Sequence, residues 1–162
     1  MPFWDEYVKK INREEFPDIE TTLEHVDALA AFFVSKPEAF DVVVASNLFG
    51  DILTDLGAAT VGGMGLAPSA NINPEKNFPS MFEPVHGSAP DIAGKGIANP
   101  AAAIWCVSMM LEQLGEEEAG TVVLDALQDV IEKKEAVTPD LGGTGTTVQF
   151  GDAVCQTLKD RM

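Results

Sequence analysis

Apolar residues recur along most of the chain at the spacing of amphipathic helices. Near the N-terminus, Trp4, Val8 and Ile11 follow helical spacing with charged residues between them, and Pro17-Asp18 interrupts the pattern. The same periodicity predicts six helices, over residues 4–16, 26–35, 47–59, 100–114, 121–134 and 146–158.

Shorter apolar runs predict strands between these helices. Val42-Val43-Val44 predicts a buried strand over residues 41–45. Further short strands are predicted over residues 19–25 and 81–85, and loops over residues 62–68, 69–80, 86–96 (with one helical turn) and 138–144. Because strands alternate with helices, the predicted fold class is α/β. The strands are few for so long a chain, which suggests that they form part of a larger sheet.

The composition is typical of a folded domain and excludes some partners. Hydrophobic residues make up 46% and charged residues 22% of the 162 positions, so a wholly disordered chain is not expected. The formal net charge of −16 repels nucleic-acid phosphates and anionic membranes, so we expect neither as a partner. No run of about 18 apolar residues is present. Two cysteines without paired spacing favour a reducing, cytoplasmic setting.

Two acidic residues on a predicted helix are candidate metal ligands. Asp51 and Asp55 stand four residues apart, which places both carboxylates on one face, one turn apart. Like charges there destabilise a helix unless a cation lies between them, and Mg²⁺ and Mn²⁺ prefer carboxylate oxygens. On spacing alone, a solvated helix face is the favoured interpretation of the pair. Asp27, near the start of a helix, could simply favour its positive end.

A second candidate site is the segment of residues 83–91, Glu-Pro-Val-His-Gly-Ser-Ala-Pro-Asp. A predicted strand leads here into a loop of small residues, whose exposed N–H groups would suit a pyrophosphate. His86 could stack on a ligand or donate to it, although a single histidine is more often structural. The glycine spacing matches neither a P-loop nor the Rossmann fingerprint, so any nucleotide site is of another type.

Together these segments resemble the isocitrate/isopropylmalate dehydrogenase family. Residues 47–55, Asn-Leu-Phe-Gly-Asp-Ile-Leu-Thr-Asp, with Gly63-Met-Gly65 after them, resemble the family signature. Residues 83–100 resemble its cofactor loop, and residues 139–144 resemble its C-terminal segment. Within the family, residues 44–47 and 67–74 and the segment around Ile104-Trp105 are most similar to the tartrate/D-malate dehydrogenases.

The resemblance implies an isopropylmalate dehydrogenase-like fold, of which this chain is the C-terminal half. Residues 1–61 would belong to the smaller, dimer-forming domain and residues 62–162 to the larger, cofactor-binding domain. Asp51 and Asp55 would bind Mg²⁺ or Mn²⁺, and Asp27 would reach the neighbouring subunit's metal in a homodimer. The implied activity is the NAD-dependent oxidative decarboxylation of a 2-hydroxy diacid of the tartrate, D-malate or 3-isopropylmalate type.

The resemblance also implies a binding site for NAD. Glu83 would lie near the nicotinamide, Asp91 would accept hydrogen bonds from the adenine ribose, and Asn99 would meet the adenine. The complete implied set is Glu83, His86, Gly87, Ser88, Ala89, Asp91, Ile92, Ala98 and Asn99.

No catalytic residue is assigned within the chain. The family's lysine base, tyrosine acid and substrate-binding arginines have no match here, so we expect the isolated chain to be inactive. The alternative is a non-catalytic product of a truncated or split gene that acts only as an assembly partner.

Overall fold

The computed structural model describes residues 2–161 and contains every helix that the periodicity predicts. The ends agree with the predicted ranges to within four residues, and the largest difference is an earlier start of the fifth helix. The observed helices are α1 (Pro2–Glu15), α2 (Val26–Ser35), α3 (Asn47–Thr60), α4 (Ala101–Leu114), α5 (Glu117–Lys133) and α6 (Thr147–Arg161). The chain divides into two compact units, Met1–Leu53 and Thr54–Met162.

Short local contacts stabilise the helices of the first unit. At the end of α1, the side-chain amide of Asn12 donates to the carbonyl oxygens of Phe16 and Ile19, at 3.0 and 2.8 Å. Beyond α2, the ring of Phe40 stacks on that of Phe32 with 6.4 Å between their centroids. The ammonium of Lys36 lies 3.7 Å from the centre of the Phe32 ring, a cation–π contact.

The two strands predicted in this unit are not formed, and both predictions are wrong. Residues 19–25 and 41–45 are irregular apart from a single bend at the first residue of each range. Val42 and Val44 are 83% and 66% exposed instead of buried. A strand needs a neighbour to pair its main-chain groups, and among residues 2–161 no strand lies beside either segment.

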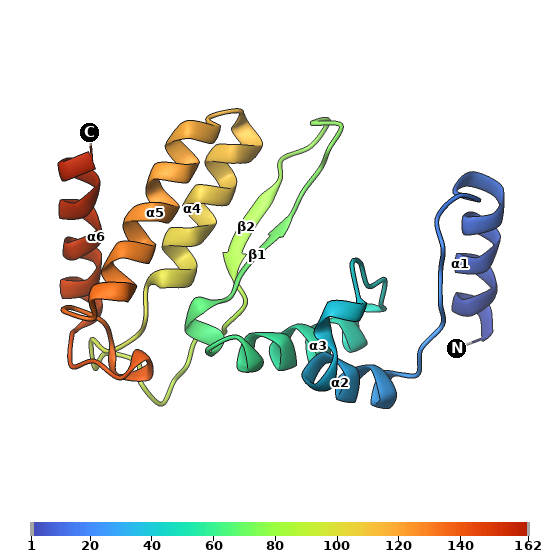
Figure 1. Ribbon diagram of the computed structural model, residues 1–162, viewed down its shortest axis with the longest axis horizontal. Coiled ribbons are helices and arrows are strands. Elements are labelled where there is room, and N and C mark those ends of the chain that lie inside the picture. The colour runs from blue at the N-terminus through green and yellow to red at the C-terminus, as the bar shows by residue number, and fades with distance from the viewer. Residues whose placement is uncertain (1, 162) are drawn as a thin grey trace. The chain divides into compact units, whose positions relative to one another are not determined.

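The second unit is built on three helices, α4, α5 and α6, which pack side by side (Figure 1). Their contact buries a common apolar core, with Phe150 of α6 fully enclosed. Where α4 meets α5, the buried hydroxyl of Ser108 donates to the carbonyl oxygen of Gly120 at 2.8 Å. The core residues are Ala101, Ala126, Leu127, Val130, Val137, Phe150 and Val154.

One arginine ties the end of α6 to α5. The guanidinium of Arg161 lies 2.8 Å from the carboxylate of Asp129 and 3.3 Å from that of Asp125. The hydrogen bond to Asp129 is the main cause that raises the pKa of Arg161, and the same bond lowers the pKa of Asp129.

A β-hairpin packs against α4. Strand β1 (Pro68–Asn71) pairs antiparallel with β2 (Met81–Pro84), and Ser69 stands opposite Glu83. The strand predicted at residues 81–85 is therefore confirmed, whereas the loop predicted over residues 69–80 is wrong at its start. Ser69 to Asn71 become a strand because β2 supplies the pairing partner, which the local sequence does not reveal.

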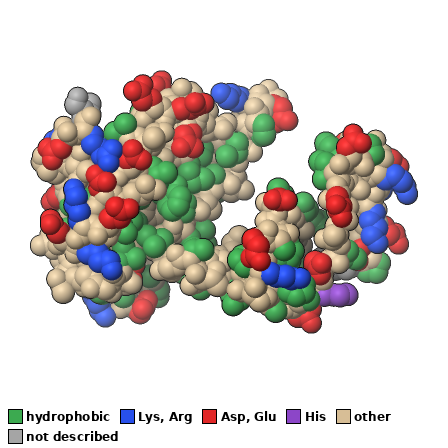
Figure 2. Space-filling model, viewed as in Figure 1, with side chains coloured by type: hydrophobic (Ala, Val, Ile, Leu, Met, Phe, Trp, Pro, Cys, Tyr) green, Lys and Arg blue, Asp and Glu red, His purple; other side chains and the backbone are tan. Residues whose placement is uncertain are grey.

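Three single-turn 3-10 helices occur in the described loops: η1 (Pro37–Ala39), η2 (Met64–Leu66) and η3 (Pro139–Leu141). The helical turn predicted within residues 86–96 is replaced by two successive tight turns, closed by Ile92 N to Ala89 O and Lys95 N to Ile92 O. Acidic side chains are spread over the face that Figure 2 shows. Within residues 2–161, no helix has the length and apolar character needed to cross a bilayer.

Candidate functional site

The candidate metal carboxylates lie on a helix that is formed as predicted. Asp51 and Asp55 stand four residues apart on α3, and both are exposed. Residues at this spacing face the same side of a helix. Asn47, with its side-chain amide oriented to donate, lies 3.1 and 3.3 Å from the two carboxylate oxygens of Asp51. Carboxylate oxygens in this arrangement have the donor chemistry that Mg²⁺ and Mn²⁺ prefer.

The third predicted ligand, Asp27, is exposed on α2. Its carboxylate accepts a hydrogen bond from the N–H of Ala28 at 2.9 Å, which satisfies a donor at the helix start. Across the described part of the chain, no three or more His, Cys, Asp and Glu side chains gather closely enough to hold a metal ion. The structure thus presents a pair of carboxylates on α3 and does not gather Asp27 into a three-ligand centre.

The candidate cofactor loop begins where β2 ends. Glu83 is exposed on β2, and its carbonyl oxygen accepts a hydrogen bond from the hydroxyl of Ser69 at 2.9 Å. Val85 N donates to the carbonyl of Ala67 at 3.0 Å, which fixes the point where the chain leaves the hairpin. His86 follows, half-buried, with Nδ1 3.1 Å from the carbonyl oxygen of Gly87.

The loop presents main-chain donors to solvent. Within residues 2–161, the N–H groups of Gly87, Ser88 and Ala89 donate to no protein acceptor. Ala89 has a φ of 41°, in the left-handed region that costs a residue with a Cβ about 1–2 kcal/mol. Nothing lies within 4 Å of a Cβ built on Gly87, so the backbone is open to close approach. Free donors on an open backbone fit an anionic group such as a pyrophosphate.

Asp91 follows this open stretch with an exposed side chain. Its carboxylate oxygens can accept hydrogen bonds from vicinal hydroxyls and would repel a phosphate in the same place. The next residue, Ile92, is half-buried and closes the turn back to Ala89 at 3.0 Å.

The far end of the loop is more firmly held. Asn99 is only 9% exposed; its Nδ2 donates to Oδ2 of Asp140 at 2.8 Å, and its Oδ1 accepts from the N–H of Ala101 at 2.9 Å. The preceding Ala98 is exposed, and its carbonyl oxygen accepts a hydrogen bond from the hydroxyl of Thr147. Both polar atoms of the Asn99 side chain are therefore engaged within the protein.

The residues that hold this end are not among those that the sequence pattern singles out. Asp140 and Thr147 lie 41 and 49 residues beyond their partners, so local spacing could not relate them to the loop. The sequence signal nearest to these residues is the family-like segment at residues 139–144. Its motif alone does not indicate that it contacts the loop.

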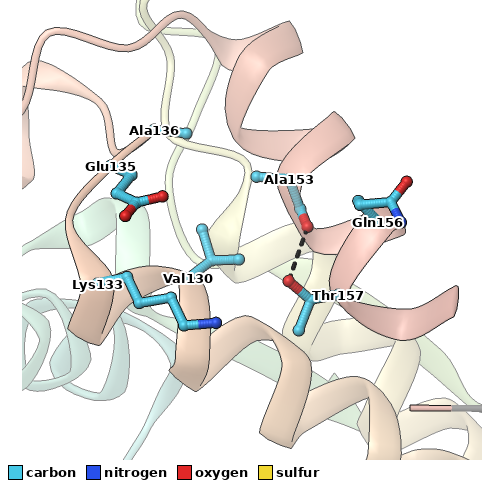
Figure 3. Close-up of a pocket in the computed structure, with 7 residues that line it drawn as sticks. All are labelled: Val130, Lys133, Glu135, Ala136, Ala153, Gln156 and Thr157. Atoms are coloured by element: carbon cyan, nitrogen blue, oxygen red, sulfur yellow. Dashed lines mark hydrogen bonds between the residues drawn. The ribbon is translucent and has the colours of Figure 1, made fainter. Parts of the chain in front are cut away.

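Two cavities in the second unit are lined by residues other than those predicted for the site. One, of about 200 Å³, lies between α5 and α6 (Figure 3). There the hydroxyl of Thr157 donates to the carbonyl of Ala153 at 2.9 Å, so it is already paired within the helix. The other, of about 350 Å³, lies between the hairpin loop and the end of α4, with Phe78, Phe82 and Leu114 in its wall. The loop and the α3 pair are open surface features instead of enclosed pockets.

Known proteins similar to this chain agree on one family. The model of the isocitrate/isopropylmalate dehydrogenase family matches residues 1–154. A probable tartrate dehydrogenase/decarboxylase of Bacillus subtilis is 54% identical over 98% of this chain and 44% of its own length. The decarboxylating D-malate dehydrogenase of Escherichia coli is also 54% identical, over 98% of this chain and 45% of its own length.

The structural similarity has the same extent. The crystal structure of isocitrate dehydrogenase from Methylococcus capsulatus superimposes with a TM-score of 0.85 and 46% identity, over 95% of this chain and 45% of that one. This confirms the predicted fold as part of an isopropylmalate dehydrogenase-like architecture. The chain spans a little under half the length of the curated relatives it matches. On the family match, the sequence identity and the shared fold, this chain belongs to the isocitrate/isopropylmalate dehydrogenase family.

Proposed function

We propose that this chain forms part of a dehydrogenase that oxidatively decarboxylates a 2-hydroxy diacid, with NAD⁺ as oxidant and Mg²⁺ or Mn²⁺ as cofactor. The observation that carries the proposal is the 54% identity to enzymes named for tartrate and D-malate across 98% of the chain. Tartrate and D-malate are both 2-hydroxy diacids, and the substrate is assigned to this class. The exposed carboxylates of α3 and the open donors of the 86–91 loop are consistent with it.

Asp51 and Asp55 are the proposed metal ligands of this chain. A divalent ion bound there supplies Lewis-acid chemistry, which lowers the pKa of a coordinated hydroxyl and stabilises negative charge that develops next to it. The contribution of the protein is to hold two carboxylates at a fixed separation on a rigid helix. Asp27 is proposed as a ligand contributed to the neighbouring subunit of a homodimer.

The loop from Glu83 to Asn99 is the proposed NAD site. Main-chain N–H groups of residues 87–89 would donate to the pyrophosphate, and Asp91 would accept hydrogen bonds from the adenine ribose hydroxyls. Because Asn99 is only 9% exposed and its side chain is held by Asp140 and Ala101, its contact with adenine would come mainly from its main chain. His86, Ile92 and Ala98 would complete the walls of the site.

The domain assignment is likewise a proposal. Residues 1–61 would contribute to a smaller, dimer-forming domain and residues 62–162 to a larger, cofactor-binding domain. The lysine base, tyrosine acid and substrate arginines would come from the rest of the enzyme. Proton transfer by such groups typically supplies about 10²- to 10⁴-fold in rate, so this chain by itself is expected to be inactive. A cytoplasmic location remains a prediction.

The test combines metal binding with turnover. Calorimetry should show Mn²⁺ binding that weakens at least tenfold in Asp51→Asn, since the substitution removes a charged ligand at nearly constant volume. Asp152→Asn, an exposed acid on α6, is the matched control and should bind as the unchanged chain does.

For turnover, the chain is supplemented with the portion of the Escherichia coli relative that has no counterpart here. NADH should then form from D-malate or tartrate with Mn²⁺ present, and none should form without the supplement. Absence of turnover in the supplemented protein, with unchanged Mn²⁺ affinity in Asp51→Asn, would contradict the proposal and favour a non-catalytic assembly role.

A further inference from the structure

The start of α6 is bonded to the far arm of the cofactor loop, defined here as residues 96–99. Thr147, the first residue of α6, makes two hydrogen bonds to this arm. Its N–H donates to the carbonyl of Gly96 at 2.8 Å, and its hydroxyl donates to the carbonyl of Ala98 at 2.5 Å. Thr147 therefore fixes two carbonyl groups that stand two residues apart, which sets the direction of the arm.

A second anchor acts on the end of the same arm. The carboxylate of Asp140 in η3 accepts the hydrogen bond from Asn99 Nδ2, while Asn99 Oδ1 accepts from Ala101 N at the start of α4. The Asn99 side chain is thereby held between η3 and the start of α4, and it cannot rotate without breaking one of these two hydrogen bonds. A hydrogen bond to a charged acceptor is about twice as strong as a neutral one, so this anchor holds more tightly than its single distance implies.

Gly65 provides the space that the second anchor needs. A Cβ at this position would lie 2.8 Å from Cβ of Asn99 and 3.0 Å from Oδ2 of Asp140, closer than real Cβ atoms normally approach. Any larger residue would therefore displace the pair. Gly65 belongs to the Gly-Met-Gly sequence at residues 63–65, which is not among the residues proposed to bind the metal or NAD.

Without these anchors the arm has little to hold it. Gly96 has a φ of 67°, and Ala98 is exposed. If a loop becomes ordered only when a ligand binds, the entropy lost in ordering it weakens the binding of the ligand. A loop that is already ordered avoids this loss. The anchors thus have a specific consequence for binding, separate from their contribution to folding.

We propose that Thr147 and Asp140 are positioning residues for the cofactor: they hold residues 96–99 in the conformation that receives the adenine end of NAD⁺. The inference rests on the proposed NAD site. Neither side chain needs to touch the cofactor, because each acts through main-chain or side-chain groups of the arm. Gly65 makes the arrangement possible by leaving room for Asn99 and Asp140.

The test uses two threonines at the start of α6. Thr147→Val keeps the shape and the main-chain bond but removes the hydroxyl donor, and Thr147→Ser restores it. Thr146→Val is the matched control: the Thr146 hydroxyl accepts from Gln149 N at 3.2 Å and has no bond to the loop. Thr146→Val therefore removes a side-chain bond at the start of α6 but no bond to residues 96–99.

Two quantities are measured on the purified chain: hydrogen–deuterium exchange of the main-chain amide of residue 147, which donates to the Gly96 carbonyl of the arm, and the Kd for NAD⁺ by calorimetry. Thr147→Val should accelerate this exchange and weaken NAD⁺ binding, each by about three- to tenfold, the range expected for one neutral hydrogen bond. Thr147→Ser should restore both. Asp140→Ala should act in the same direction, and Thr146→Val should change neither, although its melting temperature falls.

The outcomes separate this inference from the proposed function. Faster exchange in Thr147→Val with unchanged NAD⁺ affinity would overturn the positioning role, as would unchanged exchange, or equal effects in Thr146→Val. If the unmodified chain bound no NAD⁺ at millimolar concentration, the NAD site itself would be refuted, and the positioning role with it. In that case the exchange data would still show whether the anchors order the arm.

Discussion

Thr138 offers a sharp test of the packing of the second unit. The residue is completely buried, and among residues 2–161 its hydroxyl oxygen has no hydrogen-bond partner. Its carbonyl oxygen does accept hydrogen bonds, from Leu141 N at 3.0 Å and from Gly143 N at 3.2 Å. The unfavourable contribution therefore comes from the side chain alone.

Replacing Thr138 by valine should stabilise the protein. Valine has the same branched shape, so the side-chain rotamer and the main-chain bonds are retained. Burying an unpaired hydroxyl costs about 1–3 kcal/mol in protein mutational data. We expect the free energy of unfolding to rise by about 1–2 kcal/mol. For a chain of this size, each kcal/mol of added stability raises the melting temperature by about 2–4 °C.

Urea denaturation followed by circular dichroism measures the effect, and the midpoint should rise with no change in the slope. Ser108→Ala is the control, because that hydroxyl is equally buried but bonded to the carbonyl of Gly120. It should destabilise by about 0.5–1.5 kcal/mol, since it removes a buried hydrogen bond between α4 and α5. A Thr138→Val variant less stable than the unmodified chain would refute the reasoning and would show that the hydroxyl has a partner, such as a buried water.

Three further predictions concern other parts of the second unit. Gly143→Ala should destabilise by about 1–3 kcal/mol in the same assay, because its Cβ would overlap the carbonyl oxygen of Val137, and an unchanged midpoint would contradict this contact. Asp129→Asn should lower the melting temperature at pH 7 but not near pH 2. Since Arg161 lowers the folded-state pKa of Asp129, the pair stabilises above the unfolded-state pKa of about 4 and loses its effect as pH falls through the lowered value; an equal difference at both pH values would count against the ion pair. Asp91→Asn should reduce the ratio of the Kd for NADP⁺ to the Kd for NAD⁺, because the carboxylate that repels a 2′-phosphate is gone. An unchanged ratio would show that Asp91 does not contact the adenine ribose.

The local sequence was sufficient to predict the helices. Each carries its own apolar periodicity, and a helix satisfies its main-chain hydrogen bonds within a single segment. The end of α4 is an example: Gly115 adopts a left-handed φ of 90° just after Leu114, as a glycine after a helix commonly does. The same local periodicity is enough to place Asp51 and Asp55 on one side of α3.

The strands could not be predicted in this way, because a strand is completed by a partner elsewhere in the chain. Val42 and Val44 have the composition of a buried strand, yet they are exposed because no strand lies beside them in the described chain. Ser69 and Ala70 lack strong strand character, yet they pair with β2. In both cases, the presence or absence of a pairing strand decided whether the segment formed a strand.

The candidate site divides along the same line. The sequence by itself determined the family resemblance, the carboxylate pair and the residues of the cofactor loop, because these are contiguous or closely spaced. Only the tertiary structure brought Asp140 to Asn99 and Thr147 to Ala98, across 41 and 49 residues. The physical reason is that α6 packs on α5 and α5 on α4, which returns the C-terminal helix to the arm that precedes α4. Sequence spacing carries no record of that return, since it depends on which apolar faces bury one another.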